Sequence, residues 1–246
     1  MNGELVSMRL LLVILFTLAS QLQASDILMD AAFRYWSAEA SGVVGDLGSE
    51  STQKDDSDAG YSLVFRLDFG RTISELSYTK FELSSPFEPG KTFREYTPVQ
   101  QAKSTLDFQT FDLNFRNLIH EDEYISLRWS YGLTVLDLTN KVHDSVVDRH
   151  LNITGYVPTV GVEGEWFWRR DLSIRSHLRF GDLNIGSDDV RIKDLEMGLV
   201  YMPYDAFNLE LGYKNYSLDV GKTSNGTTTI LEQNLKGPYT QVNWLF

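Results

Sequence analysis

The sequence predicts an all-β chain that folds as a single up-and-down antiparallel barrel. Two observations predict this fold: apolar and polar residues alternate from Asp26 to the end of the chain, and no stretch of comparable length there shows the 3.6-residue period of a helix. About ten strands are expected, with eight as the alternative. They lie at residues 28–41, 60–69, 72–83, 104–117, 124–141, 153–168, 172–182, 191–202, 207–219 and 229–246.

The alternation is clearest in two segments. Residues 61–69 (YSLVFRLDF) place aromatic and aliphatic side chains at every odd position, with Arg66 and Asp68 on the opposite face. Residues 124–135 continue the same pattern for longer, from Ile125 to Val135. A period of two over nine or more residues is typical of a strand with one apolar face.

The connections between these strands are predicted to alternate in length. Tight turns are expected at 70–71, 118–123, 169–171 and 203–206. Longer, polar connections are expected at Gly42–Ala59, Ser84–Lys103, Val142–Asn152, Leu183–Val190 and Val220–Thr228. Short turns at one end and long loops at the other are typical of a meander, and an even strand count puts both termini at the short-turn end. We expect Gly42–Ala59 and Ser84–Lys103 to be mobile and to face the cell exterior.

The polar face distinguishes a soluble barrel from a transmembrane one. It carries many charges interspersed with small residues such as Ser130, Gly132 and Gly161. Glycines weaken a solvated strand, but in a narrow lumen they leave room for long charged neighbours to cross and pair. The predicted lumen-lining residues are Arg34, Arg66, Asp68, Asp112, Arg116, Arg128, Glu163, Glu165, Arg175, His177, Arg179, Glu196 and Glu210, with Asp30, Glu75 and Lys214 on the same face.

Aromatic residues fall near the ends of the predicted strands, at two levels. Rings at two levels form the girdles of a membrane barrel. The set comprises Tyr35, Trp36, Phe69, Tyr156, Trp166, Trp168, Tyr201, Tyr204, Phe207, Trp244 and Phe246.

Length and composition exclude several classes of protein. The 246 residues suit one domain, and the formal net charge of −12 argues against a nucleic-acid partner, which would require basic patches. The chain has no cysteine, so disulfides, thiolate metal sites and a lipid anchor on cysteine are excluded. We expect no cofactor and no metal.

The N-terminus has the layout of a secretory signal. The apolar run Leu10–Ala19 follows Arg9 and is followed by small and polar residues. At about ten residues it is too short to span a bilayer as a helix. We predict a signal peptide at 1–24, with cleavage after Ala24 or alternatively Ala19, and a barrel domain at 25–246.

The last residues, PYTQVNWLF, place Phe246, Trp244 and Val242 on one face by parity. This segment resembles the C-terminal strand of the small outer-membrane β-barrel proteins of Gram-negative bacteria, and with the signal sequence and the alternating strands the resemblance extends over the whole mature chain. It implies a cell outer-membrane location, contact with outer-membrane lipid and lipopolysaccharide, and recognition of Val242, Trp244 and Phe246 by the barrel-assembly machinery. We expect a monomer, whose last strand pairs with the first around Ala31–Tyr35.

Candidate catalytic residues are few. Small outer-membrane barrels include proteases, lipid A deacylases and phospholipases, and residues 141–150 (KVHDSVVDRH) combine His143, Ser145 and His150 with acids. Neighbours in one flexible loop are rarely held in catalytic geometry, so no catalytic residue is assigned. The acids Asp55, Asp56 and Asp58 lack the spacing of a calcium loop.

The lumen charges permit two interpretations. Either they pair with one another and fill the barrel, or they line a pore. Eight strands leave an interior that side chains just fill, and ten strands with long Arg and Glu side chains lie close to that case. We therefore expect a non-enzymatic outer-membrane barrel with a structural or loop-mediated binding role. The alternatives are a narrow channel for small solutes and, after it, a lipid-modifying or proteolytic enzyme.

Overall fold

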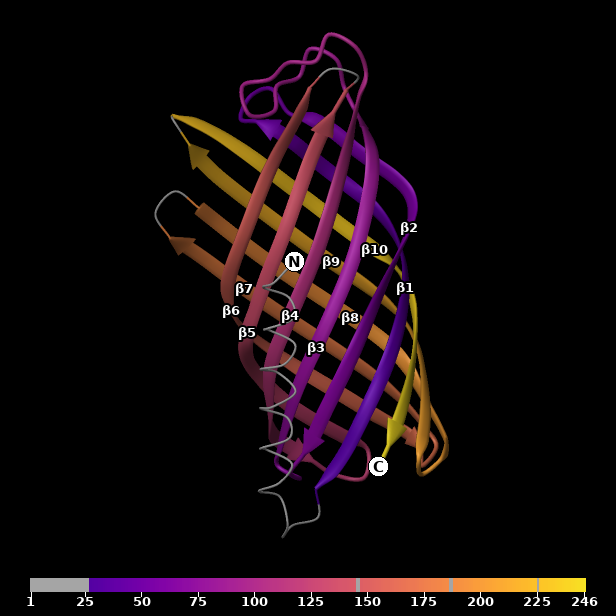
Figure 1. Cartoon of the computed structure of the whole chain (residues 1–246). Coiled ribbons are helices and arrows are strands. Elements are labelled where there is room, and N and C mark those ends of the chain that lie inside the picture. The colour runs from indigo at the N-terminus through magenta and orange to yellow at the C-terminus, as the bar shows by residue number, and fades with distance from the viewer. Residues whose placement is uncertain (1–26, 145–146, 186–187, 225) are drawn as a thin grey trace.

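A computed structural model describes residues 27–144, 147–185, 188–224 and 226–246, and the predicted signal peptide at 1–24 lies outside these. Ten strands form one closed barrel (Figure 1). They are β1 (Leu28–Asp46), β2 (Ser51–Asp68), β3 (Thr72–Phe87), β4 (Ala102–Glu121), β5 (Ile125–His143), β6 (Asp148–Arg169), β7 (Leu172–Ile185), β8 (Asp188–Tyr204), β9 (Phe207–Ser224) and β10 (Thr227–Leu245). Within the described part of the chain, no helix is long and apolar enough to cross a bilayer.

Each strand pairs antiparallel with the next in sequence, and β10 closes the barrel on β1. The closing register runs from Asp30 opposite Leu245 to Asp46 opposite Thr229. Backbone bonds between Met29 and Phe246 extend it to the last residue. The all-β, up-and-down barrel of ten strands and the pairing of the last strand with the first around Ala31–Tyr35 are thus confirmed, and closure leaves no unpaired strand edge.

The two ends of the barrel differ, but less than predicted. The turn end carries the tight connections 69–71, 122–124, 170–171 and 205–206, together with the start of β1 and the end of β10. At the opposite end, here called the loop end, β1 and β2 are joined by residues 47–50 alone. The connection between β3 and β4, residues 88–101, is long and arches over that end (Figure 1).

The polarity of the wall reverses partway along the strands, as β6 shows most clearly. At its turn-end side, Val160, Val162 and Trp166 face outward with 49–61% of their surface exposed. At its loop-end side the outward residues are polar (His150, Asn152, Thr154), whereas the inward residues Leu151, Ile153 and Val157 are buried. The residues facing inward beside Val160 and Val162 are Thr159, Gly161, Glu163 and Glu165.

The same reversal occurs on the neighbouring strands. On β5 the outward residues change from Leu133 to Asp137, and on β9 they change from Tyr213 to Asn215. We call the part of the barrel between this level and the turn end the turn half, and the part between this level and the loop end the loop half. The turn half has an apolar exterior and a charged lumen, as expected in lipid, and the loop half has a polar exterior and an apolar interior, as expected in water.

Exposed aromatic side chains lie near both limits of the turn half. Tyr35, Tyr61, Tyr156 and Tyr213 lie at its upper limit, and Trp166, Trp168, Tyr204, Trp244 and Phe246 lie at its lower limit. Trp36, which the sequence placed in a girdle, instead points inward with 3% of its surface exposed and packs on Phe81, with ring centroids 5.3 Å apart. This difference follows from parity, because Trp36 shares a face with Arg34.

Four of the five predicted long connections are mostly strand, for the same physical reason. Most of Gly42–Ala59 belongs to β1 and β2, most of Val142–Asn152 to β5 and β6, most of Leu183–Val190 to β7 and β8, and most of Val220–Thr228 to β9 and β10. Ser84–Lys103 loses only its two ends, to β3 and β4. In this part of the wall the apolar side chains point inward, so the outward alternation that marked the strands in the turn half is lost. The remaining connection, 88–101, is anchored by Phe93, which is fully buried and lies against Phe87.

Candidate functional site

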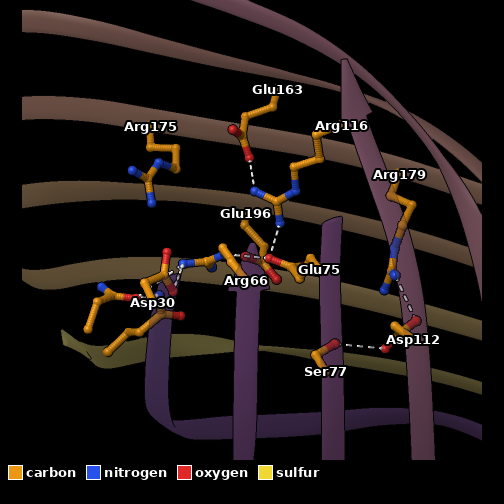
Figure 2. Close-up of polar contacts among 12 residues, drawn as sticks. Asp30, Arg66, Glu75, Ser77, Asp112, Arg116, Glu163, Arg175, Arg179 and Glu196 are labelled. Atoms are coloured by element: carbon orange, nitrogen blue, oxygen red, sulfur yellow. Dashed lines mark hydrogen bonds and ion pairs between the residues drawn. The ribbon is translucent and has the colours of Figure 1, made fainter. Parts of the chain in front are cut away.

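The lumen of the turn half holds a continuous chain of ion pairs. Asp30 contacts Arg66 at 3.3 Å, Arg66 Nε donates to Glu75 at 2.6 Å, and Arg116 Nη2 donates to the same Glu75 oxygen at 2.5 Å. Arg116 also pairs with Glu163. Figure 2 shows this chain crossing the lumen from β1 through β2, β3 and β4 to β6. Glu75 is therefore shared by two buried guanidinium groups.

A second chain crosses between opposite walls. Arg34 on β1 contacts Glu196 on β8 at 2.7 Å, and Lys214 on β9 links Glu196 to Asp194, the latter at 3.0 Å. Arg179 on β7 then joins Asp194 at 3.0 Å to Asp112 on β4 at 2.7 Å. Ser77 also donates to Asp112, at 3.4 Å (Figure 2). Strands that are not neighbours in the wall are thereby connected through the interior.

Arg175 lies between two acids, with Glu165 at 3.0 Å and Glu210 at 3.3 Å. The Tyr239 hydroxyl donates to Glu210 at 2.5 Å, and the Arg34 guanidinium lies 4.5 Å from the centroid of the Tyr239 ring. The ring lies so close to β9 that a Cβ atom on Gly212 would approach it to 2.5 Å. Glycine at position 212 is therefore what allows Tyr239 to reach Glu210.

Small inward residues permit the pairs that cross the lumen. Arg116 on β4 reaches Glu163 on β6 past β5, where Ser130 lies opposite Arg116 in the register and opposite Gly161 of β6. A Cβ atom on Gly161 would lie 2.7 Å from the Ser130 hydroxyl oxygen, so there is no room for a larger side chain beside the crossing pair. The predicted role of small lumen residues, leaving room for crossing charges, describes this arrangement.

The packed lumen of the turn half leaves small cavities among the described residues. A cavity of about 50 Å³ lies among Arg34, Arg66, Arg116, Arg179 and Lys214, and a second of about 10 Å³ lies beside Arg175 and Glu210. These volumes admit at most a few water molecules. The turn half is therefore filled by side chains, as a barrel of this size allows.

Above the ion pairs, the apolar interior of the loop half closes the barrel a second time. The Lys214 ammonium lies 5.5 Å from the Trp36 ring and 5.7 Å from the Tyr216 ring, where the two interiors meet. The Phe108 ring packs on Tyr216 at 5.5 Å. Nearer the loop end, buried residues fill the interior, among them Phe81, Leu83, Phe87, Phe93, Leu106, Leu136, Leu138, Val142, Leu151, Ile153, Ile192, Leu218 and Leu231.

Most of the predicted lumen residues point inward and come together in these chains. Arg34, Arg66, Asp112, Arg116, Glu163, Glu165, His177, Arg179 and Glu210 are buried, and Arg175 and Glu196 make the inward contacts described above. His177 lines both lumen cavities.

Two residues predicted to pair across the lumen do otherwise. Asp68 accepts the Gly70 backbone N–H at 2.7 Å and so caps the turn between β2 and β3. Arg128 faces Glu163 in the β5–β6 register, but Glu163 pairs with Arg116, and Arg128 donates to Ser126 Oγ at 3.2 Å. Asp68 therefore bonds within its own turn, and Arg128 bonds within its own strand.

Four residues of the network were not singled out in the sequence: Asp194, Tyr239, Gln241 and Asn243. Gln241 accepts from Arg34 Nε at 2.7 Å, and Asn243 accepts from Arg66 Nη1 at 3.2 Å. Parity was the available signal, because Asp194 shares a face with Glu196, and the outward set Val242 and Trp244 leaves Tyr239, Gln241 and Asn243 facing the lumen.

The two histidines of the loop end lie on β5 and β6. His143 Nδ1 contacts Asp148, and both side chains are about 60% exposed. The backbone oxygen of His150 accepts from Arg94, whereas Ser145 and the side chains of Asp55, Asp56 and Asp58 lie outside the described residues. Among the residues that the structure describes, no group of three or more His, Asp or Glu is placed to hold a metal ion.

This geometry defines a class of protein: a closed ten-strand membrane β-barrel with a charged, filled lumen. No family model matches the sequence, and no curated protein matches it. Solved structures do match. The outer membrane protease OmpT from Escherichia coli superposes with a TM-score of 0.56 at 9% identity, covering 89% of this chain and 96% of that one.

The translocator domain of the autotransporter NalP from Neisseria meningitidis gives a TM-score of 0.49 at 11% identity, over 99% of this chain and 97% of that one. The toluene transporter TodX from Pseudomonas putida gives 0.33 at 8% identity, over 90% of each chain. The structural neighbours are thus Gram-negative outer-membrane β-barrels, and the likeness to OmpT shows that this chain has their fold. At such identities the likeness carries no activity from any of them.

Proposed function

We propose that this protein is a closed, non-conducting barrel of the bacterial outer membrane that acts by binding at its loop end. The observation that carries the proposal is the double closure of the interior. The ion-pair chains fill the turn half, and the apolar core with Phe93 fills the loop half. A solute path would have to disrupt both layers.

A binding role is proposed in preference to catalysis. The His143–Asp148 pair is solvent-exposed, whereas catalytic acid–base pairs are held in position by surrounding groups. The loop end, in contrast, combines an anchored loop (88–101) with the ends of long strands. Function in barrels concentrates in such connecting segments on a rigid scaffold.

Reconstitution into planar bilayers tests the closure. The refolded full chain is expected to give no stepwise conductance in about 1 M KCl, at which ionic screening is strong. A general porin inserted under the same conditions gives conductance steps. Steady unitary conductance of the wild-type chain would support the alternative, a narrow channel for small solutes.

The location and assembly are part of the same proposal. It includes export by a cleaved signal peptide, insertion as a monomer beside outer-membrane lipid and lipopolysaccharide, and recognition by the barrel-assembly machinery. The apolar exterior of the turn half supports the insertion into lipid. The last strand presents Val242, Trp244 and Phe246 to the outside, with Phe246 72% exposed. A ring so exposed contributes little to packing within the monomer.

Deleting Phe246 is therefore expected to reduce the amount of assembled barrel in the outer membrane severalfold while leaving export intact. Heat-modifiability measures this, since a folded barrel migrates differently before and after boiling. Deletion also removes the backbone bonds to Met29, so Phe246→Asp, which keeps the backbone, is the second variant. Wild-type yields of both variants would refute an assembly role.

A further inference from the structure

A polar cleft opens at the loop end, outside both closures of the barrel. Its volume is about 370 Å³, within the range of small-molecule sites. Three segments far apart in the sequence line it: the β3–β4 loop, the start of β6 and the β9–β10 hairpin. The lining residues are Arg94, Glu95, Asp148, Arg149, His150, Ser224, Thr227 and Thr229.

One wall of the cleft is held in an unusual backbone conformation. Arg94 and Glu95 have φ angles of 50° and 64°, which non-glycine residues rarely adopt. The Asp46 carboxylate accepts both of their backbone N–H groups, at 2.9 and 2.8 Å, and the Thr229 hydroxyl donates to it at 2.7 Å. Asp46 is 6% exposed, so a buried carboxylate fixes this strained pair. Strain maintained in this way is typical of ligand-binding sites.

Direct bonds also join the walls to one another. Arg94 Nη1 donates to the backbone oxygen of His150 at 2.7 Å, which ties the loop to β6. Thr227 Oγ1 donates to Glu95 at 3.4 Å, which ties the loop to the β9–β10 hairpin. The cleft is therefore formed before any ligand arrives, and binding requires little ordering of the protein.

The chemistry of the lining identifies the class of ligand. Arg94 and Arg149 supply guanidinium groups, which bind carboxylate or phosphate through two parallel hydrogen bonds. Ser224 and Thr227 supply hydroxyl groups, and Glu95 and Asp148 supply acceptors, all suited to the hydroxyls of a sugar. One nitrogen of Arg94 is held by the His150 backbone oxygen, which leaves the Arg149 guanidinium and the other Arg94 N–H groups for an anion. Glu95 and Asp148 are partly engaged, by Thr227 and His143 respectively.

We infer that this cleft binds an acidic saccharide, with Arg149 and Arg94 on its anionic group and the hydroxyl and carboxylate side chains on the sugar ring. The inference rests on the proposed binding role at the loop end and names its site and ligand class. The acid could be a carboxylate, as in glycans outside the cell, or a phosphate, as in sugars of the cell's own lipopolysaccharide.

Calorimetric titration of the full chain in detergent tests this with three probes: glucuronic acid, glucose 6-phosphate and glucose. Both acidic sugars are expected to bind, with glucose at least tenfold weaker. Arg149→Gln should weaken the acidic sugars at least tenfold. Arg191→Gln is the matched control, because Arg191 is an exposed arginine on the outer face of β8 that pairs with Asp182, and it should change nothing.

The outcomes separate the possibilities. Tighter binding of glucuronic acid indicates a glycan outside the cell, and tighter binding of glucose 6-phosphate indicates phosphorylated sugar of the cell surface. Equal binding of glucose, no binding of either acid, or unchanged affinity in Arg149→Gln overturns the inference. Heat-modifiability checks that each variant is folded. Conductance is measured independently of sugar binding. A barrel that does not conduct and does not bind acidic sugars refutes this inference alone, whereas a barrel that conducts refutes the proposed closure alone.

Discussion

Replacing Glu75 by glutamine is expected to destabilise the barrel strongly. Glu75 is the shared partner of Arg66 and Arg116, and all three side chains are at most 10% exposed. Removing one member of a buried ion pair costs about 3–5 kcal/mol, because the remaining charge is left uncompensated. Urea unfolding in lipid vesicles, followed by heat-modifiability, measures the loss.

Glu82→Gln is the matched control, since it makes the same chemical change on the same strand. Glu82 faces outward in the loop half and is exposed. Its neutralisation should change the unfolding free energy by less than about 1 kcal/mol, as for other surface charges. An equally small effect at Glu75 would contradict the assignment of the ion-pair chain as the packing of the lumen.

The second large effect is expected from arginine substitutions along β6, where the wall reverses polarity. Val160→Arg places a charge on the lipid-facing side of the turn half, at a cost of about 2–4 kcal/mol near the bilayer midplane. Thr154→Arg is on the same face of the same strand, in the loop half, where water surrounds the wall. It is expected to be tolerated.

Ile153→Arg completes this set, because position 153 faces the apolar interior of the loop half and is 3% exposed. A charge buried there without a partner should prevent folding. The yield of heat-modifiable protein ranks the three variants, and the predicted order is Thr154→Arg, then Val160→Arg, then Ile153→Arg. Equal yields for Thr154→Arg and Val160→Arg would place both positions in the same solvent and contradict the reversal.

The strand order and the inward set in the turn half could be predicted from the sequence because one rule applies there. Side chains alternate strictly, so Phe65 and Leu113 pointing outward require Arg66 and Asp112 to point inward. The pairing of the last strand with the first could be predicted because an open strand edge does not persist in lipid. Burial on the two faces then follows without knowledge of any contact.

The loop half could not be predicted in this way. At Tyr156 and Val157 the apolar residues move from the outward to the inward parity, and the sequence pattern there resembles the end of a strand although the backbone continues. Phe93 seals the loop end from within a loop, where no periodicity marks it. Only the folded barrel shows that these residues share one apolar interior.

The pairing of charges in the lumen could not be predicted from the sequence either. Glu163 faces Arg128 in the strand register, yet pairs with Arg116 from two strands away, past Ser130. Such choices depend on the reach of long side chains across a closed barrel. Parity limits the candidates to one face and leaves their pairing to three-dimensional geometry.

The most direct test of the account is a spin-label scan along the outward face of β6. The chain contains no cysteine, so single-cysteine variants at positions 150, 152, 154, 156, 160, 162, 164 and 166 can each be labelled in reconstituted vesicles. We expect the labels at 150–154 to be more accessible to a water-soluble nickel complex than to dissolved oxygen. The labels at 160–166 should be more accessible to oxygen, which concentrates in lipid, and the change in accessibility should fall at Tyr156. Nickel access along the whole strand would show a soluble barrel, and oxygen dominance through 150–154 would place the loop half in lipid; either result contradicts the account.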